Sequence, residues 1–388
     1  MKRVLQRWLL ILMVLLPLYP QAQVMFPTDN ADEDGNMRKR RIVPLIYYSN
    51  PDRIFAGLKF VVARGRIKDD PYGYEQSVQL RYSITQNSFS AVYDGTFKEL
   101  IGKWNLSVNA YYDWLVWTNF FGLGNETQRI NPIKYYRLST SEYAANVGVN
   151  RLFADHHYVD VTAYMQGIEV FKQGTLVTEN YLNNKTYYFE HHTYASMRAS
   201  YTYQDVDDHV LPRKGVMLYG AAGYTVNTFE TEKSFAKLNG IAQAYLPLFG
   251  KFSLSVRAAG STITGTPEFY QYVTVGGPMN LRGYWRDRFW GNTAFYNSNE
   301  LRYITDMRIG KYTGQVGVIG LFDNGRVWLD NEHSDKMHYS YGGGLLVCPM
   351  HKFTGSITYA QTNDDGGLVQ LRITKLLNKM TASRGGTY

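Results

Sequence analysis

One arginine, which lies in a glycine-rich stretch, is the residue whose neighbours most clearly indicate a chemical role. A guanidinium that enters a confined protein interior needs carboxylate partners, which it engages through two parallel hydrogen bonds. Glycines on either side allow the backbone to form a tight, inward-folded loop. This pattern predicts buried ion pairing at a loop tip. The stretch contains Gly276, Gly277, Leu281, Arg282, Gly283 and Tyr284.

Residue patterns typical of catalysis or metal binding are weak in this sequence. The adjacent pairs His156–His157 and His191–His192 fall in strand-like segments, where neighbouring side chains face opposite sides and do not chelate one metal. Asp207–His209 forms a loop cluster without an identifiable nucleophile. The single cysteine, Cys348, excludes an internal disulfide framework. We therefore expect no enzyme activity, no cofactor and no metal site.

The composition argues against a disordered chain and against a nucleic-acid partner. The chain has 388 residues, of which 45% are hydrophobic, 15% aromatic and 19% charged. Abundant aromatic residues argue against disorder. The net charge of +8 is spread along the chain, apart from a basic run at Arg38–Arg41, so no nucleic-acid partner is expected.

The N-terminus resembles an export signal. Lys2, Arg3 and Arg7 accompany a short apolar run, Trp8–Leu18, which is too short to span a bilayer. We expect residues 1–22 to be a signal peptide. Residues 23–50 are then expected to be a short periplasmic arm.

Apolar and polar residues alternate repeatedly in the rest of the chain. Segments 78–85, 104–113, 252–258 and 369–374 each place apolar side chains on one face and more polar side chains on the other. A soluble β-sandwich and a membrane β-barrel both show this alternation. Runs of about 9–11 residues, with aromatic residues near their ends, favour a transmembrane barrel.

The alternation predicts an all-β, transmembrane antiparallel barrel of sixteen strands over residues 51–377. Residues 378–388 would form a C-terminal tail. The largest interruption, 265–292, contains Arg282. The expected strands lie at 54–65, 75–86, 88–97, 103–114, 135–152, 157–169, 175–189, 191–205, 215–226, 235–247, 252–264, 293–304, 315–328, 338–348, 353–361 and 367–377.

Three ordered motifs carry a family resemblance. Leu281–Tyr284 reads LRGY, Glu300 lies on the next expected strand, and Phe322–Gly325 reads FDNG on the strand after it. In order and spacing these resemble the Omp85 superfamily, also called surface-antigen (D15) barrels. Shorter segments at 121–125 and 212–215 are also similar to family segments. The likeness covers essentially residues 42–377.

The resemblance implies roles for the charged residues. The sixth extracellular loop would fold into the barrel, and Arg282 would pair with Glu300 and Asp323 on the wall. Alternation places Glu300 on the inward face. Asp323 shares its face with the apolar Ile319 and Leu321, for which a β-bulge or the barrel end is the expected explanation.

The resemblance also implies a function. We expect a protein of the cell outer membrane, exported by its signal peptide and in contact with the lipid bilayer. It would take part in outer-membrane protein assembly, insertion or translocation. Such family members usually carry periplasmic POTRA domains, for which this sequence has no room, so separate periplasmic or outer-membrane subunits are expected as partners. The alternative is a passive pore for small solutes.

Overall fold

The computed structural model describes residues 30–31, 36–49, 53–66, 73–172, 176, 178–179, 186–310, 312–330, 332–351 and 353–374. The chain divides into two compact units. The first holds the described residues up to Trp117 together with Ser139–Arg151 and Tyr164–Phe171. The second holds Thr118–Leu138, Leu152–Ala163 and the described residues from Lys172 onward.

The first unit is an antiparallel meander of long strands. Each of β2 to β5 pairs with the next strand along the chain, and the β5–β6 ladder is interrupted by a register shift between Phe97 and Ile101. A short strand, β1 (Asn30–Ala31), pairs with the start of β2. The strands are β2 (Asn36–Ser49), β3 (Arg53–Arg66), β4 (Tyr74–Ser83), β5 (Ser88–Ile101) and β6 (Trp104–Asn119).

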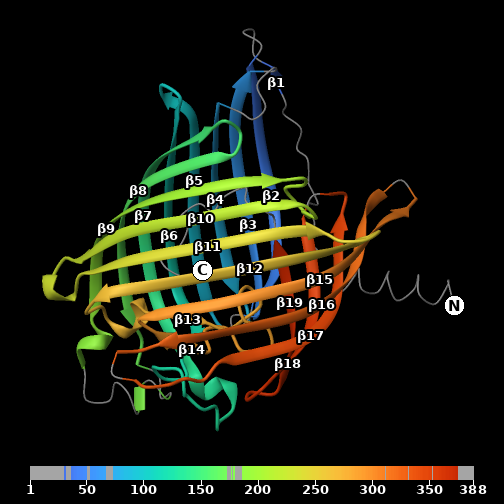
Figure 1. The fold of residues 1–388 in the computed structure, drawn as a ribbon. Helices are drawn as coiled ribbons and strands as arrows, with labels where there is room; N and C mark the ends of the chain where they lie inside the picture. Colours follow the sequence, from blue (N-terminus) through green and yellow to red (C-terminus); the bar gives the residue numbers. More distant parts are fainter. Residues whose placement is uncertain are drawn as a thin grey trace. The chain divides into compact units, whose positions relative to one another are not determined.

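The second unit contains an unbroken antiparallel series from β9 to β19 (Figure 1). Residues of β7 (Arg137–Phe153) and β8 (His157–Val170) fall in both units. The strands of the series are β9 (His191–Val206), β10 (Gly215–Asn227), β11 (Phe235–Pro247), β12 (Phe252–Gly265), β15 (Thr293–Ile309), β16 (Tyr312–Trp328), β17 (His338–Pro349), β18 (Thr354–Thr362) and β19 (Gly367–Thr374).

The loop between β12 and β15 carries a small sheet of its own. There β13 (Val273–Val275) pairs with β14 (Phe289–Gly291), and this pair forms a sheet separate from the long strands. The named helical elements are short 3-10 turns. They are η1 (Ile133–Tyr136), η3 (Thr186–Phe189), η4 (Thr231–Lys233) and η5 (Phe269–Gln271). In the described part of the chain, no helix is long and apolar enough to cross a membrane.

The strand count agrees with the prediction, but two of the expected elements were wrong. The described residues form sixteen long strands, β2 to β12 and β15 to β19. One of them, β2, lies within residues 23–50, which were expected to be an arm. The basic run Arg38–Arg41 and Pro44 hid its alternation, because proline and clustered charge both argue against a strand. Conversely, the strand expected at 175–189 is contradicted at its end, where Thr186–Phe189 is a 3-10 turn.

Three other predicted segments lie wholly or largely outside the described residues. They are the signal peptide at 1–22, the remainder of the arm up to residue 35 apart from β1, and the tail at 378–388.

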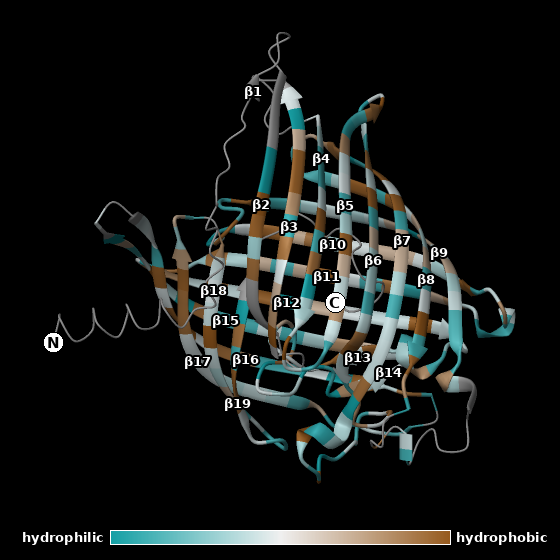
Figure 2. Cartoon of the chain, turned by 180° about the vertical axis from the view of Figure 1, so that it is seen from behind, coloured by the Kyte–Doolittle hydropathy of each residue, from teal (hydrophilic) through white to brown (hydrophobic). Residues whose placement is uncertain are grey.

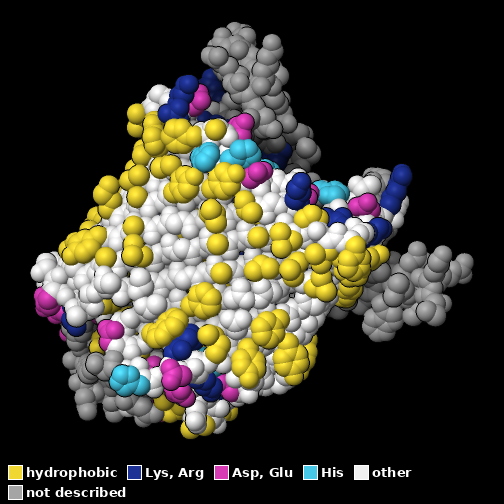
Figure 3. Space-filling model, viewed as in Figure 1, with side chains coloured by type: hydrophobic (Ala, Val, Ile, Leu, Met, Phe, Trp, Pro, Cys, Tyr) yellow, Lys and Arg dark blue, Asp and Glu magenta, His cyan; other side chains and the backbone are white. Residues whose placement is uncertain are grey.

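The outer face of the second unit is apolar. Leu301, Val318, Tyr341, Leu345 and Val369 are each at least 44% exposed, although all lie in the middle of regular strands. Hydropathy alternates along the strands (Figure 2). Figure 3 shows hydrophobic side chains over β10 to β12, with charged side chains gathered toward the strand ends. Exposed apolar side chains on a strand face are typical of contact with lipid.

The inner face of the same strands carries buried polar side chains. Examples are Ser255, Ser298, Ser340, Thr358 and Thr362, all less than 10% exposed. This arrangement is the reverse of that in a soluble sandwich, whose apolar faces meet in the core. The polar inner face is the surface on which the loop between β12 and β15 lies.

Candidate functional site

The loop that joins β12 to β15, here called loop 6, turns sharply at its tip. The side-chain oxygen of Asn280 accepts hydrogen bonds from the backbone N–H groups of Gly276 (2.9 Å) and Leu281 (2.7 Å). Gly276 has φ +128°, and a Cβ there would lie 2.4 Å from the carbonyl oxygen of Trp285. Glycine is therefore required where the two limbs of the loop meet.

Arg282 sits at the loop tip and is 2% exposed. Its Nη1 lies 2.5 Å from Glu300 Oε1. Its Nε donates to Asp323 Oδ2 (2.7 Å) and its Nη2 to Asp323 Oδ1 (2.6 Å), a two-bond pairing of the kind that arginine favours. The structure thus brings together the three charged residues singled out from the sequence.

Electrostatics keep this arginine charged. Burial alone would lower the pKa of Arg282, but hydrogen bonds and negative charge from Asp323 and Glu300 raise it above its ordinary value. Nη2 also donates to Ser298 Oγ (3.1 Å) and to the carbonyl of Asn299 (3.2 Å). The guanidinium is therefore paired on every side.

Glu300 is shared by three arginines. Oε2 accepts from Nε of Arg302 (2.6 Å), which comes from the same strand, and Oε1 accepts from Nη2 of Arg372 (2.6 Å) on β19. Together with Arg282, three cations surround two carboxylates. Such a network is stable only when every member is paired, because an isolated buried charge is costly.

Asp323 faces inward without a β-bulge. The ladders of β16 with β15 and β17 run without a register shift through Asp323, which pairs with Ser298 and Ser340. The bulge, one of the two explanations expected from the sequence, is therefore wrong. Ile319 and Leu321 share its face because they are buried against Leu211, from the turn between β9 and β10.

The last strand also holds the loop tip. Gln370 on β19 accepts a hydrogen bond from the backbone N–H of Gly283 (3.0 Å) and donates one to the carbonyl of Tyr284 (2.7 Å). Gly283 has φ +86°, and a Cβ there would lie 2.8 Å from the carbonyl oxygen of Ala360 on β18. The tip therefore lies directly against the last two strands.

Tyr284 anchors the loop to the turn between β18 and β19. Its hydroxyl lies 2.6 Å from Asn363 Oδ1 and 2.5 Å from Asp364 Oδ1. Burial, together with hydrogen bonding to Asp364, raises the pKa of Tyr284 above its ordinary value. The phenol is therefore neutral and acts as a hydrogen-bond donor.

Asp364 also contacts His338, the first residue of β17. His338 Nδ1 lies 2.9 Å from Asp364 Oδ2, its Nε2 lies 2.9 Å from the carbonyl oxygen of Asn125, and its ring stacks on Phe289 at 3.8 Å. Both ring nitrogens thus face an acceptor. Burial would raise the pKa of Asp364, but hydrogen bonds from His338, Lys336 and Tyr284 hold it below its ordinary value.

A second buried arginine joins three loops. Nε of Arg288 donates to Asp365 Oδ2 (2.6 Å) and Nη2 donates to the carbonyl of Thr127 (2.7 Å). Its guanidinium lies over the rings of Phe121 (4.7 Å) and Phe289 (4.5 Å). The 121–125 segment, noticed in the sequence, therefore helps to enclose loop 6.

The two aspartates of the 207–209 cluster bind backbone groups of a turn. Asp207 accepts hydrogen bonds from the backbone N–H groups of Arg213 and Lys214, and Asp208 accepts them from Val210 and Leu211. Both carboxylates thus shape the turn that inserts Leu211. Among the described residues, no group of histidine, cysteine and acidic side chains is arranged to hold a metal ion.

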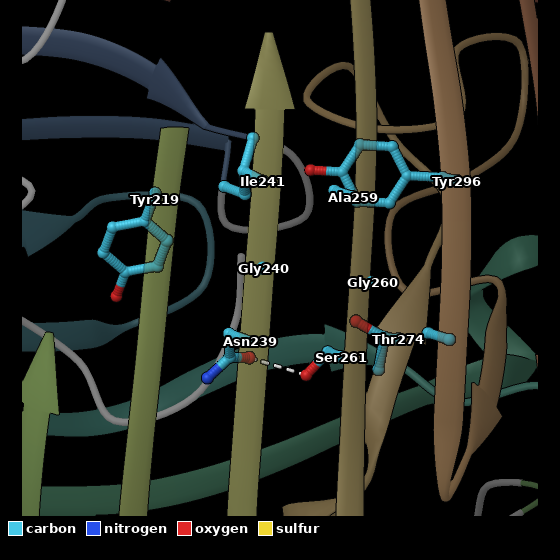
Figure 4. A pocket seen from close by; sticks show the side chains of 10 residues that line it. Tyr219, Asn239, Gly240, Ile241, Ala259, Gly260, Ser261, Thr274 and Tyr296 are labelled. Atoms are coloured by element: carbon cyan, nitrogen blue, oxygen red, sulfur yellow. Dashed lines mark hydrogen bonds between the residues drawn. The ribbon is translucent and has the colours of Figure 1, made fainter. Parts of the chain in front are cut away.

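A small cavity lies along the stem of loop 6. Strands β10, β11, β12 and β15 line it together with Thr274 of β13, and Asn239 Oδ1 accepts a hydrogen bond from Ser261 Oγ (2.6 Å) beside it (Figure 4). Its volume of about 20 Å³ has room for little more than a water molecule. This cavity does not offer a site for a substrate.

Comparison with known proteins decides the family. Residues 69–373 match the Omp85 superfamily domain. The chain belongs to the Omp85 superfamily. Omp85 proteins of this kind are β-barrels of the outer membrane, and the antiparallel strands with an apolar outer face agree with that class.

Two solved structures resemble the fold of this Omp85 chain. BamA from Haemophilus ducreyi lacking POTRA domains 1–3 has 13% sequence identity and a TM-score of 0.63, over 87% of this chain and 69% of that one. CdiB from Escherichia coli has 14% identity and a TM-score of 0.55, over 86% of this chain. The match spans 61% of CdiB, less than two thirds of its length. No curated protein matches the sequence.

Several residues of this Omp85 site escaped the sequence reasoning. Arg302 shares a face with Glu300 two residues away, so alternation alone places it at the site. Gln370 and Arg372 were recognised as the polar face of the last strand, but nothing local indicated what they contact. His338 and Asp364 carried no signal, because their meeting brings together the start of β17 and the turn between β18 and β19.

Proposed function

We propose that this Omp85 protein acts in the assembly, insertion or translocation of other proteins at the outer membrane. It would work together with separate periplasmic or outer-membrane subunits, and it would carry out no enzymatic step. The observation that carries the proposal is the docked tip of loop 6. Arg282 is completely enclosed by Asp323, Glu300 and their neighbours.

The second candidate, a passive pore, fits the inner face less well. A pore for small solutes needs a free aqueous path along its wall. Loop 6 lies against β15, β16, β18 and β19 through Arg282 and Gln370. Leu211 packs against β15 to β18 in an apolar cluster with Ile304 and Leu346. These contacts favour a protein whose inner face is occupied by loop 6 and Leu211 over an open channel.

The test of the proposal is Arg282→Ala. The expected result is a protein that still fractionates with the outer membrane and still migrates in a heat-modifiable way, because the strand ladders are intact. Client assembly or secretion should fall severalfold, since the loop tip loses its five side-chain hydrogen bonds.

Arg286→Ala is the matched control. This arginine belongs to the same loop, but its side chain is 48% exposed and contacts Asp287 at 3.5 Å, so the change should leave activity intact. Normal client assembly in Arg282→Ala would overturn the proposal. A large, stable conductance of the wild type in planar bilayers, with unchanged outer-membrane protein levels on depletion, would establish the pore instead.

A further inference from the structure

Side chains of the last strand, β19, contact loop 6. These contacts are not needed for the hydrogen-bond ladder between β19 and β18. β19 has eight residues, all paired with β18. Two of its inward side chains, Gln370 and Arg372, also reach the site, one to the loop backbone and the other to Glu300. We propose that Gln370 and Arg372 are positioning residues that fix the register of β19 to the docked tip of loop 6. The functional consequence of this inference rests on the proposed function, whereas the contacts from which the inference is drawn do not.

The ladder alone specifies this register weakly. On the outer face of β19, Val369 and Leu371 are both apolar, so a slip that brings Leu371 to the place of Val369 replaces one apolar side chain with another, whereas the opposite slip brings Gly367 there. Because side chains alternate with a period of two, such a slip also keeps every residue on its own face. The hydrophobic pattern therefore does not distinguish the native register from one shifted by two in the first of these directions.

The inner face does distinguish the two registers. The site occupied by Gln370 requires an acceptor for the N–H of Gly283 and a donor for the carbonyl of Tyr284, and a primary amide supplies both. A slip by two would bring Leu368 or Arg372 to this position. Leucine has neither group, and a guanidinium has no acceptor.

Arg372 is a second residue that distinguishes the native register from a slipped one. In the native register it pairs with Ser356 on β18 and reaches Glu300 Oε1, the same oxygen that Arg282 contacts. A slipped strand would leave Glu300 with one arginine fewer and would bury a cation elsewhere, which is costly. Docking of loop 6 and the register of β19 therefore stabilise each other.

The coupling has a functional consequence. Release of the Arg282–Tyr284 tip would remove the two hydrogen bonds to Gln370. Arg372 would keep its contact with Glu300, which belongs to β15. The native register of β19 would then lose the contribution of Gln370 and keep that of Arg372, so a slip would become easier, whereas redocking of the tip would restore the full preference. Loop 6 would thus influence the register of β19 in addition to filling the inner face.

Crosslinking reads the register directly. Tyr359 pairs with Val369 in the native register, so Tyr359→Cys with Val369→Cys reports that register. Tyr359→Cys with Leu371→Cys, or with Gly367→Cys, reports a slip by two in either direction. Cys348 is fully buried and does not compete.

Gln370→Leu should raise the ratio of slipped to native crosslinks about tenfold, because two hydrogen bonds are lost. Gln370→Glu keeps the acceptor and loses the donor, so it should give a smaller shift in the same direction. Gln361→Leu is the matched control. This glutamine lies on β18, and its side chain bonds to the hydroxyl of Tyr359 and not to loop 6. Tyr359→Cys removes that hydroxyl from every cysteine background, so Gln361→Leu should leave the ratio unchanged.

The outcomes separate the inference from the proposed function. An unchanged crosslink ratio in folded, heat-modifiable Gln370→Leu protein would overturn the positioning role. An equal shift in the Gln361→Leu control would overturn it too. A shifted ratio with normal client assembly would leave the positioning role standing and count against the proposed function. Shifted register together with reduced assembly supports both.

Discussion

Glu300 is the residue on which the charge balance of the site depends. It is 4% exposed and accepts hydrogen bonds from Arg282, Arg302 and Arg372. Loss of one partner from a buried ion pair is far more destabilising than loss of an exposed one, because the remaining charge stays buried and unpaired. The arginines therefore depend on this carboxylate for their stability within the protein.

Glu300→Gln should lower the stability of the folded protein by about 3–5 kcal/mol. The midpoint of urea or thermal unfolding in detergent, followed by the heat-modifiable gel shift, measures this change. Glu232→Gln is the control, since Glu232 is exposed in η4 and should shift the midpoint little. Equal midpoints for Glu300→Gln and the wild type would show that Glu300 does not make the expected contribution to the free energy of unfolding.

At the scale of elements, loop 6 is held at two levels. At the inner level, Arg282 and Gly283 contact β15, β16 and β19. At the outer level, Tyr284 and Arg288 join the loop to the turn between β18 and β19, and the ring of Tyr284 also contacts that of His338 on β17. Asn125 strengthens the outer level, since its backbone N–H lies 2.8 Å from Glu332 Oε2 and its side chain donates to Ser334 and Lys336. The two levels involve different charges and should respond differently to pH.

The outer level should weaken in acid. The folded-state pKa of Asp364 is held below its ordinary value of 3.8, so the carboxylate contributes stability that is present above that pH and is lost as pH falls toward its folded-state pKa. The protection of residues 363–366 against hydrogen exchange, relative to the intrinsic rate at each pH, should fall below about pH 4. Asp364→Asn should show fast exchange already at neutral pH and a flatter pH dependence.

Asp335→Asn is the matched control for this titration, because Asp335 is exposed in the neighbouring segment. It should retain the wild-type pH profile. A protection factor at residues 363–366, that is, the exchange rate relative to the intrinsic rate at each pH, that stays constant from pH 7 to pH 3 in the wild type would contradict the assigned role of Asp364.

At the scale of the molecule, the sheet of the second unit carries its apolar side chains outward. Val318 is 52% exposed in the centre of β16, next to Leu345 at 44% and Tyr303 at 36%. In water such a surface would drive aggregation, whereas in lipid it is the favourable arrangement. Membership of the Omp85 superfamily explains why these side chains are left uncovered.

Val318→Arg should therefore destabilise the membrane-inserted protein by about 2–4 kcal/mol if the residue lies at the bilayer midplane. Folding into vesicles, followed by urea titration, measures the cost, and Val318→Leu serves as the control. Recovery of the processed wild-type chain as a soluble protein without detergent would contradict the lipid-facing assignment.

Local periodicity made most of the strands predictable. Alternation with a period of two depends only on neighbouring residues, so it identified the faces of β15 and β19 and the inward direction of Glu300. It failed at β2, where Arg38–Arg41 and Pro44 obscure the pattern. It also failed near 186–189, where Tyr188 packs against Phe269 of loop 6 at 5.4 Å and does not continue a strand.

The sequence by itself determined the class of fold, the loop that bears Arg282 and the order of the LRGY, Glu300 and FDNG motifs. Only the tertiary structure decided which groups meet them. Gln370 and Arg372 reach the site from a strand about 90 residues along the chain from Arg282, and Leu211 accounts for the apolar neighbours of Asp323. The physical reason is that side-chain direction follows from local backbone geometry, whereas partners across an interior depend on the register of strands far apart in the chain.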